Sequence, residues 1–248
     1  MNYYEIHEKA YQKLKEQGHE SWDQFLGQSS QFEETGFKTF WEYAVKQSSF
    51  SIQNPMALEL GCGTGPGSCF LANLGFIVDG IDISMTAVEV AREQAKKRNL
   101  NIKYNQSDIC KDKLQKNKYD LIVDAHCMHC IATQQDRTFA FQNIQNALKP
   151  EGYFWLSTML GNDTTTFKDS SLWDTDGILW TKASASSDFK SKKEIDGSFY
   201  IPHRRVYRDH KRLENELVDA GFKIVYNNID DDTNSEHPGL YQAICQLA

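Results

Sequence analysis

The sequence predicts a doubly wound α/β fold, in which a mostly parallel β-sheet carries helices on both of its faces. From about residue 50 onward, short apolar runs alternate with amphipathic segments at helical spacing. Such alternation is typical of strand–helix–strand units. The run YDLIVDA at 119–125 is apolar nearly throughout, which indicates a strand that is buried on both faces of a parallel sheet.

The strands that this alternation predicts are short and are bounded by glycine or polar residues. In the regular part of the chain they are expected at 56–60, 76–83, 101–108, 119–125 and 153–159, with KPEG as a turn before the last of these. Two closing strands are expected at 222–229 and 239–247, joined by a polar stretch.

The helices between these strands are recognised by apolar residues that recur every three or four positions. Ser84 is placed to cap one helix, and Thr133 with Asp136 forms the start signal of another. Gly75 and Gly221 are expected to end two more. The apolar faces are expected to be formed by Phe70, Leu71 and Leu74, by Met85, Val88, Ala91 and Ala95, by Ala140, Ile144, Ala147 and Leu148, and by Leu213, Leu217 and Ala220.

Two segments lie outside this alternation. Residues 1 to about 48 are expected to form a helical cap, and residues 160 to about 207 form a Ser-, Asp- and Lys-rich insertion. Because the insertion holds Trp173, Trp180, Phe199 and Tyr200, it is more typical of a lid or a substrate wall than of a linker. With these additions, residues 1–248 are expected to form a single domain.

Composition excludes several classes of protein. The net charge of −7 and the pI of about 5.5 disfavour broad binding to nucleic acid or to an anionic membrane. The polar N-terminus is not a signal peptide, and no run of about 18 apolar residues occurs. Six scattered cysteines without an export signal are expected to be reduced thiols of a cytoplasmic protein.

The most informative motif is the loop in ALELGCGTGPG. Gly61, Gly63 and Gly65 directly follow a strand and lead into a helix, so the backbone of this loop can approach a ligand closely. The dinucleotide fingerprint Gly-x-Gly-x-x-Gly does not fit in either register, because its last position falls on Pro66 or Ser68. The pattern is instead Glu-x-Gly-x-Gly-x-Gly, starting at Glu59.

Two acids stand at the ends of the next two strands. Asp82 ends the second strand and is placed to accept hydrogen bonds from both hydroxyls of a ribose, whereas Asp108 ends the third and is placed to accept one from an exocyclic amine such as that of adenine. Either residue alone is equally consistent with an ordinary turn position. Their occurrence together with the glycine loop favours a nucleoside site.

With these motifs the chain resembles a class I S-adenosylmethionine-dependent methyltransferase of the small-molecule type. LELGCGTG resembles the first motif of that family, GIDIS its ribose-binding acid, SDI its adenine segment, YDLIVDAHCMHCI its fourth strand and LKPEGYFWLS its fifth. The resemblance covers about residues 50–160 and, more loosely, 208–248. It departs at Glu151, where the family usually has glycine, and this turn lies away from the cofactor.

The resemblance implies a seven-stranded sheet with one antiparallel strand near the C-terminus, and S-adenosylmethionine as cofactor, with S-adenosylhomocysteine as product and no metal. It implies that the glycines lie along the methionine part, that Asp82 holds the ribose with Ile83 against the adenine, and that Asp108 binds the adenine amine. The remaining residues expected around the cofactor are Trp22, Glu59, Cys62, Ser107, Ile109, Asp124, Ala125 and His126.

The stretch DAHCMHCI at 124–131 is a candidate metal, redox or catalytic cluster. A zinc site usually takes ligand pairs from two segments, and Cys127-x-x-Cys130 has no second pair elsewhere, so metal binding is disfavoured. His126 or His129 is the candidate that faces the substrate, as a general base or as an orienting group. The alternative is a hydrogen-bonded structural histidine, and Met128 and Ile131 are expected to be core residues.

The insertion ends in SFYIPHRRVYRDH, which supplies candidate substrate-binding residues. If this segment is extended, Arg204 and Arg205 point to opposite faces, so only one of them can face the pocket. Beside Tyr200, that arginine is placed to clamp a substrate carboxylate or phosphate. Exposed arginines paired with surface acids are the alternative, as a core position is for Trp22.

The function that these features favour is methyl transfer to a small molecule by in-line displacement, without nucleic-acid or membrane partners. Three alternatives stay open: a protein that binds the cofactor without transferring methyl, a methyltransferase acting on a macromolecule, and a dinucleotide oxidoreductase. The macromolecular alternative is disfavoured because the fourth strand lacks the Asn/Asp-Pro-Pro-aromatic motif and no basic stripe is evident. The sequence leaves the acceptor atom and the oligomeric state open.

Overall fold

A computed structural model describes residues 3–50, 53–162, 165, 167, 172–184, 191–230 and 238–248. Its main sheet has seven strands among these residues. They are β1 (Met56–Leu60), β2 (Ile77–Asp82), β3 (Lys103–Gln106), β4 (Tyr119–Ala125), β5 (Leu148–Leu160), β10 (Phe222–Asp230) and β11 (Gly239–Leu247).

The strand order of the main sheet is β10-β11-β5-β4-β1-β2-β3. The pairs from β5 through β4 and β1 to β3 are parallel, whereas β11 is antiparallel to both of its neighbours. The predicted fold class is therefore confirmed, including the single antiparallel strand near the C-terminus. Because β1 pairs with both β2 and β4, the order of connection reverses at β1, which is where open α/β sheets bind ligands.

One predicted boundary is wrong. The stretch KPEG was expected to be a turn before a strand at 153–159, but β5 begins at Leu148 and runs through it. Tyr119 pairs with Leu148, and the register of β4 against β5 then shifts before Leu121 pairs with Tyr153. Pairing with the neighbouring strand thus extends β5 into a sequence whose local signal was that of a turn.

The helices begin where the capping signals predict. Ser84 Oγ accepts a hydrogen bond from the backbone of Ala87 at 3.1 Å, and Thr133 Oγ1 accepts one from that of Asp136 at 3.2 Å. The helices are α1 (Tyr3–Glu16), α2 (Trp22–Phe25), α3 (Lys38–Gln47), α4 (Pro66–Asn73), α5 (Met85–Lys97), the 3₁₀ turn η1 (Met128–Cys130), α6 (Gln134–Ala147) and α7 (His210–Asp219).

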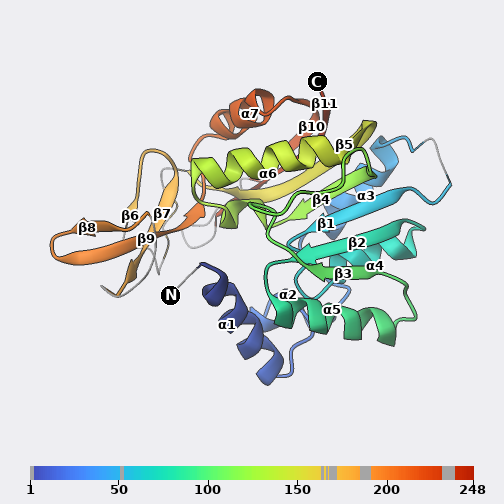
Figure 1. The fold of residues 1–248 in the computed structure, drawn as a ribbon, viewed down its shortest axis with the longest axis horizontal. Helices are drawn as coiled ribbons and strands as arrows, with labels where there is room; N and C mark the ends of the chain where they lie inside the picture. The colour runs from blue at the N-terminus through green and yellow to red at the C-terminus, as the bar shows by residue number, and fades with distance from the viewer. Residues whose placement is uncertain are drawn as a thin grey trace.

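Helices cover both faces of the main sheet (Figure 1). On one face, α6 and α7 bury apolar side chains such as Phe141 and Leu217 against strand residues that include Phe154. On the other face, α3 and α4 pack Trp41 and Leu71 against the sheet. Burial of these side chains from water supplies the main favourable term in folding.

The insertion forms a second, smaller sheet that the sequence did not predict. Its strands are β6 (Leu172–Trp173), β7 (Ile178–Ala183), β8 (Lys193–Ile195) and β9 (Ser198–Arg205), in the order β6-β7-β9-β8. This small sheet projects from the side of the molecule to which the parallel strands point, next to α1 (Figure 1). Residues 163–164, 166, 168–171 and 185–190 of the predicted lid lie outside the described residues.

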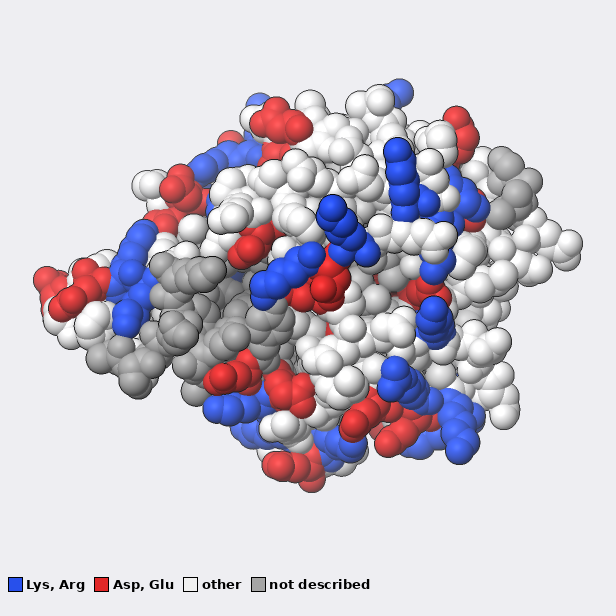
Figure 2. All heavy atoms as spheres, in the orientation of Figure 1, with Lys and Arg blue, Asp and Glu red and all other residues white. Residues whose placement is uncertain are grey.

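Positive and negative side chains are interspersed on the face of the molecule that Figure 2 shows. No single-sign stripe crosses that face. Within the described ranges, every helix is too short or too polar to span a bilayer.

Candidate active site

A cavity of about 90 Å³ lies where the parallel strands end. Its walls come from the loop after β1, the ends of β2 and β3, the segment after β4, and α1, which closes it with His7 and Tyr11. The predicted site residues that line it are Gly61, Asp82, Ile83, Ser107, Asp108, Ile109 and His126.

The glycine loop next to this cavity has a left-handed backbone conformation that residues other than glycine rarely adopt. Gly61 and Gly63 have φ values of +57° and +53°. A Cβ atom on Gly61 would lie 2.6 Å from Cys127 Cβ, and one on Gly63 would lie 2.8 Å from Tyr11 Oη. Both glycines are therefore required by conformation and by space.

Asp82 holds the glycine loop to the end of β2. Its carboxylate accepts hydrogen bonds from the backbone of Gly63 at 2.9 Å and from that of Ser84 at 2.8 Å. The residue is only 5% exposed, and burial raises the pKa of its carboxyl to about 6. A carboxylate that already accepts two backbone bonds is fixed in position and retains lone pairs for a ligand.

Two further carboxyl groups are buried beside it. Glu59 packs against α4, where its carboxylate accepts a 2.5 Å hydrogen bond from Ser68 Oγ. Burial raises the pKa of this carboxyl group to about 8. Asp124 accepts hydrogen bonds from the backbones of Cys127 and Met128 through Oδ1, while burial raises its pKa to about 7. Oδ2 of Asp124 is buried without a hydrogen-bond partner. We refer to Glu59, Asp82 and Asp124 as the buried carboxylate set.

Asp108 lies at the end of the cavity formed by β3. It accepts a hydrogen bond from the backbone of Cys110 at 2.9 Å and pairs with Lys111 at 2.9 Å. Partial burial raises its pKa. Ser107 donates to Asp112 at 2.9 Å, which ties the turn after β3 together.

The stretch DAHCMHCI leaves β4 through a left-handed residue and enters η1. His126 has a φ of +71°, a strained value for a side chain of its size and one that is enriched at functional sites. The rings of His126 and His129 lie 5.6 Å apart, edge to face. Met128 and Ile131 are buried, which confirms their predicted place in the core.

Both histidines are held neutral. Burial, reinforced by the charge of Arg204, lowers the pKa of His126 to about 4. Burial lowers the pKa of His129 well below its usual value. All six cysteines are free thiols, and the described part of the chain contains no group of three or more His, Cys, Asp or Glu side chains arranged for a metal ion.

Arg204 and Arg205 point to opposite sides of β9. Arg205 donates to the carbonyls of Ala132 at 2.9 Å and Asp176 at 3.0 Å, so it joins the small sheet to the segment after η1. Arg204 lies on the other side, close enough to the cavity to lower the pKa of His7 and His126.

Several predicted site residues lie outside the cavity. Trp22, which was expected beside the cofactor, packs its ring 5.6 Å from that of Tyr11. Tyr11, and not Trp22, lines the cavity next to the glycine loop. Cys62 is buried under the loop in a cluster with Tyr104. Gly65 faces the same Tyr104, Tyr200 is buried in the small sheet, and Ala125 packs in the core.

The sequence analysis missed His7 and Tyr11. Both lie on α1, four residues apart, so they share one face of that helix. This spacing was visible in the sequence, but nothing in it indicated that the face would meet the glycine loop.

The chain is similar to known methyltransferases. Residues 57–152 match a family model described as a methyltransferase domain. A ubiquinone biosynthesis O-methyltransferase of Histophilus somni (strain 2336) is 33% identical over 121 residues, which are 46% of this chain and 49% of that protein. The matched region is thus about half the length of that relative.

The fold is shared with solved structures at low sequence identity. A S-adenosylmethionine-dependent methyltransferase from Clostridium acetobutylicum ATCC 824 superposes with a TM-score of 0.62 at 16% identity, covering 96% of this chain and 99% of the other. The structure of a DhpI-SAH complex gives a TM-score of 0.60 at 15% identity, covering 99% and 97%. Residues 57–152 are thus similar to a methyltransferase domain, and the chain as a whole shares the fold of S-adenosylmethionine-dependent methyltransferases.

Proposed function

We propose that this protein transfers the methyl group of S-adenosylmethionine to a small-molecule acceptor. The observation that carries the proposal is the buried carboxylate set around the glycine loop. Its three acids are at most 5% exposed, and none of them forms an ion pair with a described residue. Unpaired buried carboxyls favour a cationic ligand, and S-adenosylmethionine carries a sulfonium and an ammonium group.

The residues of the cavity fit such a cofactor. We infer that Asp82 accepts hydrogen bonds from the ribose hydroxyls, that Ile83 and Ile109 pack against the adenine, and that Asp108 with Ser107 binds its amine. Gly61 and Gly63 leave space along the methionine part. Asp124 and Glu59 lie behind the cavity wall with raised pKa values of about 7 and 8, and a bound cation favours their ionised forms and so gains negative potential there. The cavity is smaller than the roughly 300–1,000 Å³ of typical ligand pockets, so binding requires α1 to move outward.

When bound, S-adenosylmethionine supplies a methyl group that is activated for in-line displacement and leaves S-adenosylhomocysteine. The task of the protein is then to orient the acceptor, to exclude water and to take up a proton if the acceptor carries one. We assign the exclusion of water to the closure of α1 and the uptake of a proton to the histidines after β4. We propose that His126, which lines the cavity, accepts the proton.

The acceptor is proposed to be a small molecule because the ubiquinone-biosynthesis relatives are named for such chemistry. Those names also favour oxygen as the acceptor atom. The interspersed charges of the visible face (Figure 2) offer no continuous track for a nucleic-acid backbone. The small sheet of the insertion and α1 are the elements that we propose to cover the acceptor.

The test is transfer of labelled methyl from S-adenosylmethionine to separate small-molecule, RNA and protein fractions of a cell extract. Label is expected in the small-molecule fraction. Label confined to RNA or protein would overturn the small-molecule acceptor. No label in any fraction, with S-adenosylhomocysteine bound, would instead indicate a cofactor-binding protein without transfer activity.

The role of His126 is tested by His126→Gly. Glycine accepts the left-handed backbone of this position without strain, so the melting temperature is expected to stay the same or to rise. Loss of the proton acceptor is expected to lower methyl transfer about 10²-fold with cofactor affinity retained. Full transfer by this variant would exclude His126 from the reaction.

A further inference from the structure

Four histidines and one arginine lie close enough to one another beside the cavity for their charges to interact. His7 comes from α1, His126 and His129 follow β4, and His203 and Arg204 come from β9. We call these five residues the histidine–arginine cluster. The rings of His126 and His129 are 5.6 Å apart, and β9 packs against the segment after η1 through the hydrogen bond from Arg205 to Ala132.

Two side chains of the cluster, Arg204 and His129, have polar atoms that the described residues leave without a hydrogen bond. Nε of Arg204 and Nδ1 of His129 are buried without hydrogen-bond partners, and His129 is only 3% exposed. None of the ion pairs among the described residues includes Arg204. Burial, and after it the charge of Arg204, lowers the pKa of His7 and that of His126, each to about 4.

The two arginines that are fully buried among the described residues, Arg137 and Arg205, are paired within the protein. Arg137 forms a 2.6 Å ion pair with Glu216 and donates to the carbonyl of Met128. Arg205 donates to two carbonyls and to Tyr207 Oη at 3.4 Å. Arg204 is only partly buried, but its Nε is buried without a hydrogen-bond partner among the described residues. A buried donor left unpaired is costly, so an external anion is a favourable partner for this side chain.

We propose that Arg204 binds an oxyanion, a carboxylate or a phosphate, that is carried by the methyl acceptor. This inference rests on the proposed function, because it assigns a chemical class to the acceptor of that same site. The planar guanidinium group matches both anions with two hydrogen bonds, and the anion supplies the partner that Nε lacks. His129 lies behind His126 rather than in the cavity wall, and we propose that its unpartnered Nδ1 adds a further contact when the anion binds.

The two sets of residues thereby favour ligands of opposite charge. The buried carboxylate set attracts the cationic cofactor, while the histidine–arginine cluster attracts the anionic acceptor. The anion also offsets the charge of Arg204 at His126, and so raises the pKa of that imidazole from about 4 toward neutral pH, where it is a more effective base. Acceptor binding thus prepares the residue that we propose takes the proton.

The test measures binding of benzoate, inorganic phosphate and uncharged benzyl alcohol to the complex with S-adenosylhomocysteine, by calorimetry and by histidine proton resonances. Benzoate or phosphate is expected to bind at least about tenfold more tightly than benzyl alcohol. Arg204→Gln is expected to lose that advantage, and Arg204→Lys to keep part of it. The bound anion is expected to raise the pKa of His126.

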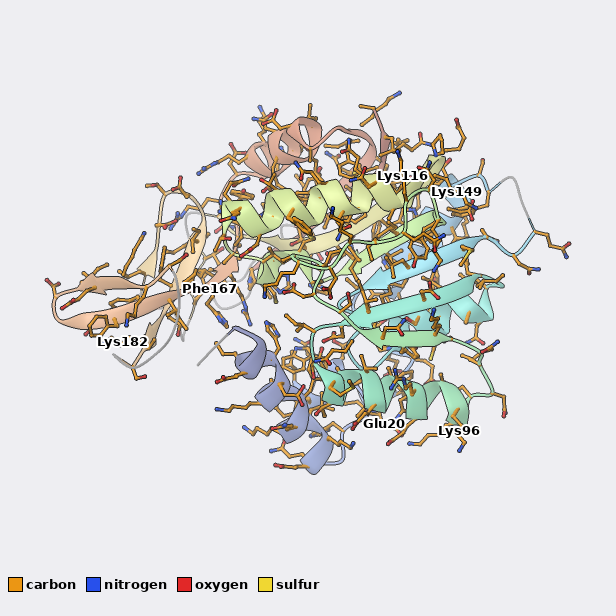
Figure 3. The ribbon with its side chains drawn as sticks, viewed as in Figure 1. Glu20, Lys96, Lys116, Lys149, Phe167 and Lys182 are labelled. Atoms are coloured by element: carbon orange, nitrogen blue, oxygen red, sulfur yellow. The ribbon has the colours of Figure 1, made fainter. Side chains whose placement is uncertain are left out.

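The matched control is Lys182→Gln, which removes an exposed charge from the outer part of the small sheet (Figure 3). Its anion affinity is expected to stay within about twofold of wild type. Equal affinity of the wild type for benzoate, phosphate and benzyl alcohol, or unchanged anion binding in Arg204→Gln, would overturn the inference. Failure of the wild type to bind S-adenosylhomocysteine would instead contradict the proposed function.

Discussion

At the scale of single residues, the site depends on acids that are buried before any ligand arrives. Glu59, Asp82 and Asp124 each end a parallel strand or lie next to its end, and burial raises the pKa of each carboxyl group. Backbone hydrogen bonds hold Asp82 and Asp124 in place. When ionised, carboxylates fixed in this way bind a cationic ligand favourably. Without a ligand, their burial lowers the stability of the folded protein.

The variant Asp124→Asn tests how much a buried carboxylate destabilises the ligand-free protein, because this effect depends on pH. Because the folded pKa of about 7 exceeds the unfolded value of 3.8, ionisation of Asp124 lowers the free energy of unfolding as pH rises between these values. The asparagine variant lacks this loss, so its stability relative to wild type is expected to increase from pH 4 to pH 7 and then to level off. Urea unfolding at several pH values measures the free energy of unfolding of both proteins. If the two proteins depend on pH in the same way, the pKa of Asp124 is not raised by burial.

Asp82→Asn tests the proposed ribose contact. Loss of a charged acceptor is worth about 1.5–3 kcal/mol per hydrogen bond, so affinity for S-adenosylhomocysteine is expected to fall about 10- to 100-fold. The control is Asp79→Asn on the same strand, because Asp79 binds Lys118 and Tyr119 instead of the glycine loop. Equal losses in both variants would show a general effect of destabilising β2.

Much of this site was predictable residue by residue. Asp82, Asp108 and the glycines stand next to strand ends, and that local pattern determines where their backbones lie. The roles of Arg204 and Arg205 were not predictable, because alternation along a strand separates two neighbours without telling which one faces inward. Only the docking of β9 on Ala132 assigns the faces.

At the scale of elements, α1 is the part of the chain that controls entry to the cavity. Glu8 fastens α1 to the start of α5, where it accepts hydrogen bonds from Ser84 Oγ at 2.7 Å and from Thr86. His7 and Tyr11 on the same helix then close the cavity. Since the closed cavity is small, release of α1 is expected to limit the rate of cofactor binding.

Glu8→Ala is therefore expected to speed association of S-adenosylhomocysteine about tenfold. This factor corresponds to a loss of roughly 1.4 kcal/mol of the free energy that holds α1 in its closed position. Stopped-flow fluorescence measures this rate. Lys15→Ala is the control on the same helix, because its ion pair with Glu89 is exposed and contributes little. A wild-type rate in Glu8→Ala would mean that α1 is not the barrier.

At the scale of the whole molecule, the main sheet was predictable and the additions to it were not. Buried parallel strands and capped helices repeat signals that are local in sequence. The small sheet pairs strands across turns and loops in a polar segment, and β8 is exposed throughout, so no hydrophobic pattern marks it. The contact of α1 with the glycine loop joins segments more than 50 residues apart, which no local pattern encodes.

The most direct test of the account is a calorimetric titration of the purified protein with S-adenosylmethionine, S-adenosylhomocysteine and NADH. The glycine loop, Asp82 and the buried carboxylate set predict that the first two bind at one site per chain and that NADH does not. The affinity for S-adenosylmethionine is expected to rise from pH 6 to pH 8 as the carboxyl groups ionise. Binding of NADH, or of none of the three by folded protein, would contradict the account.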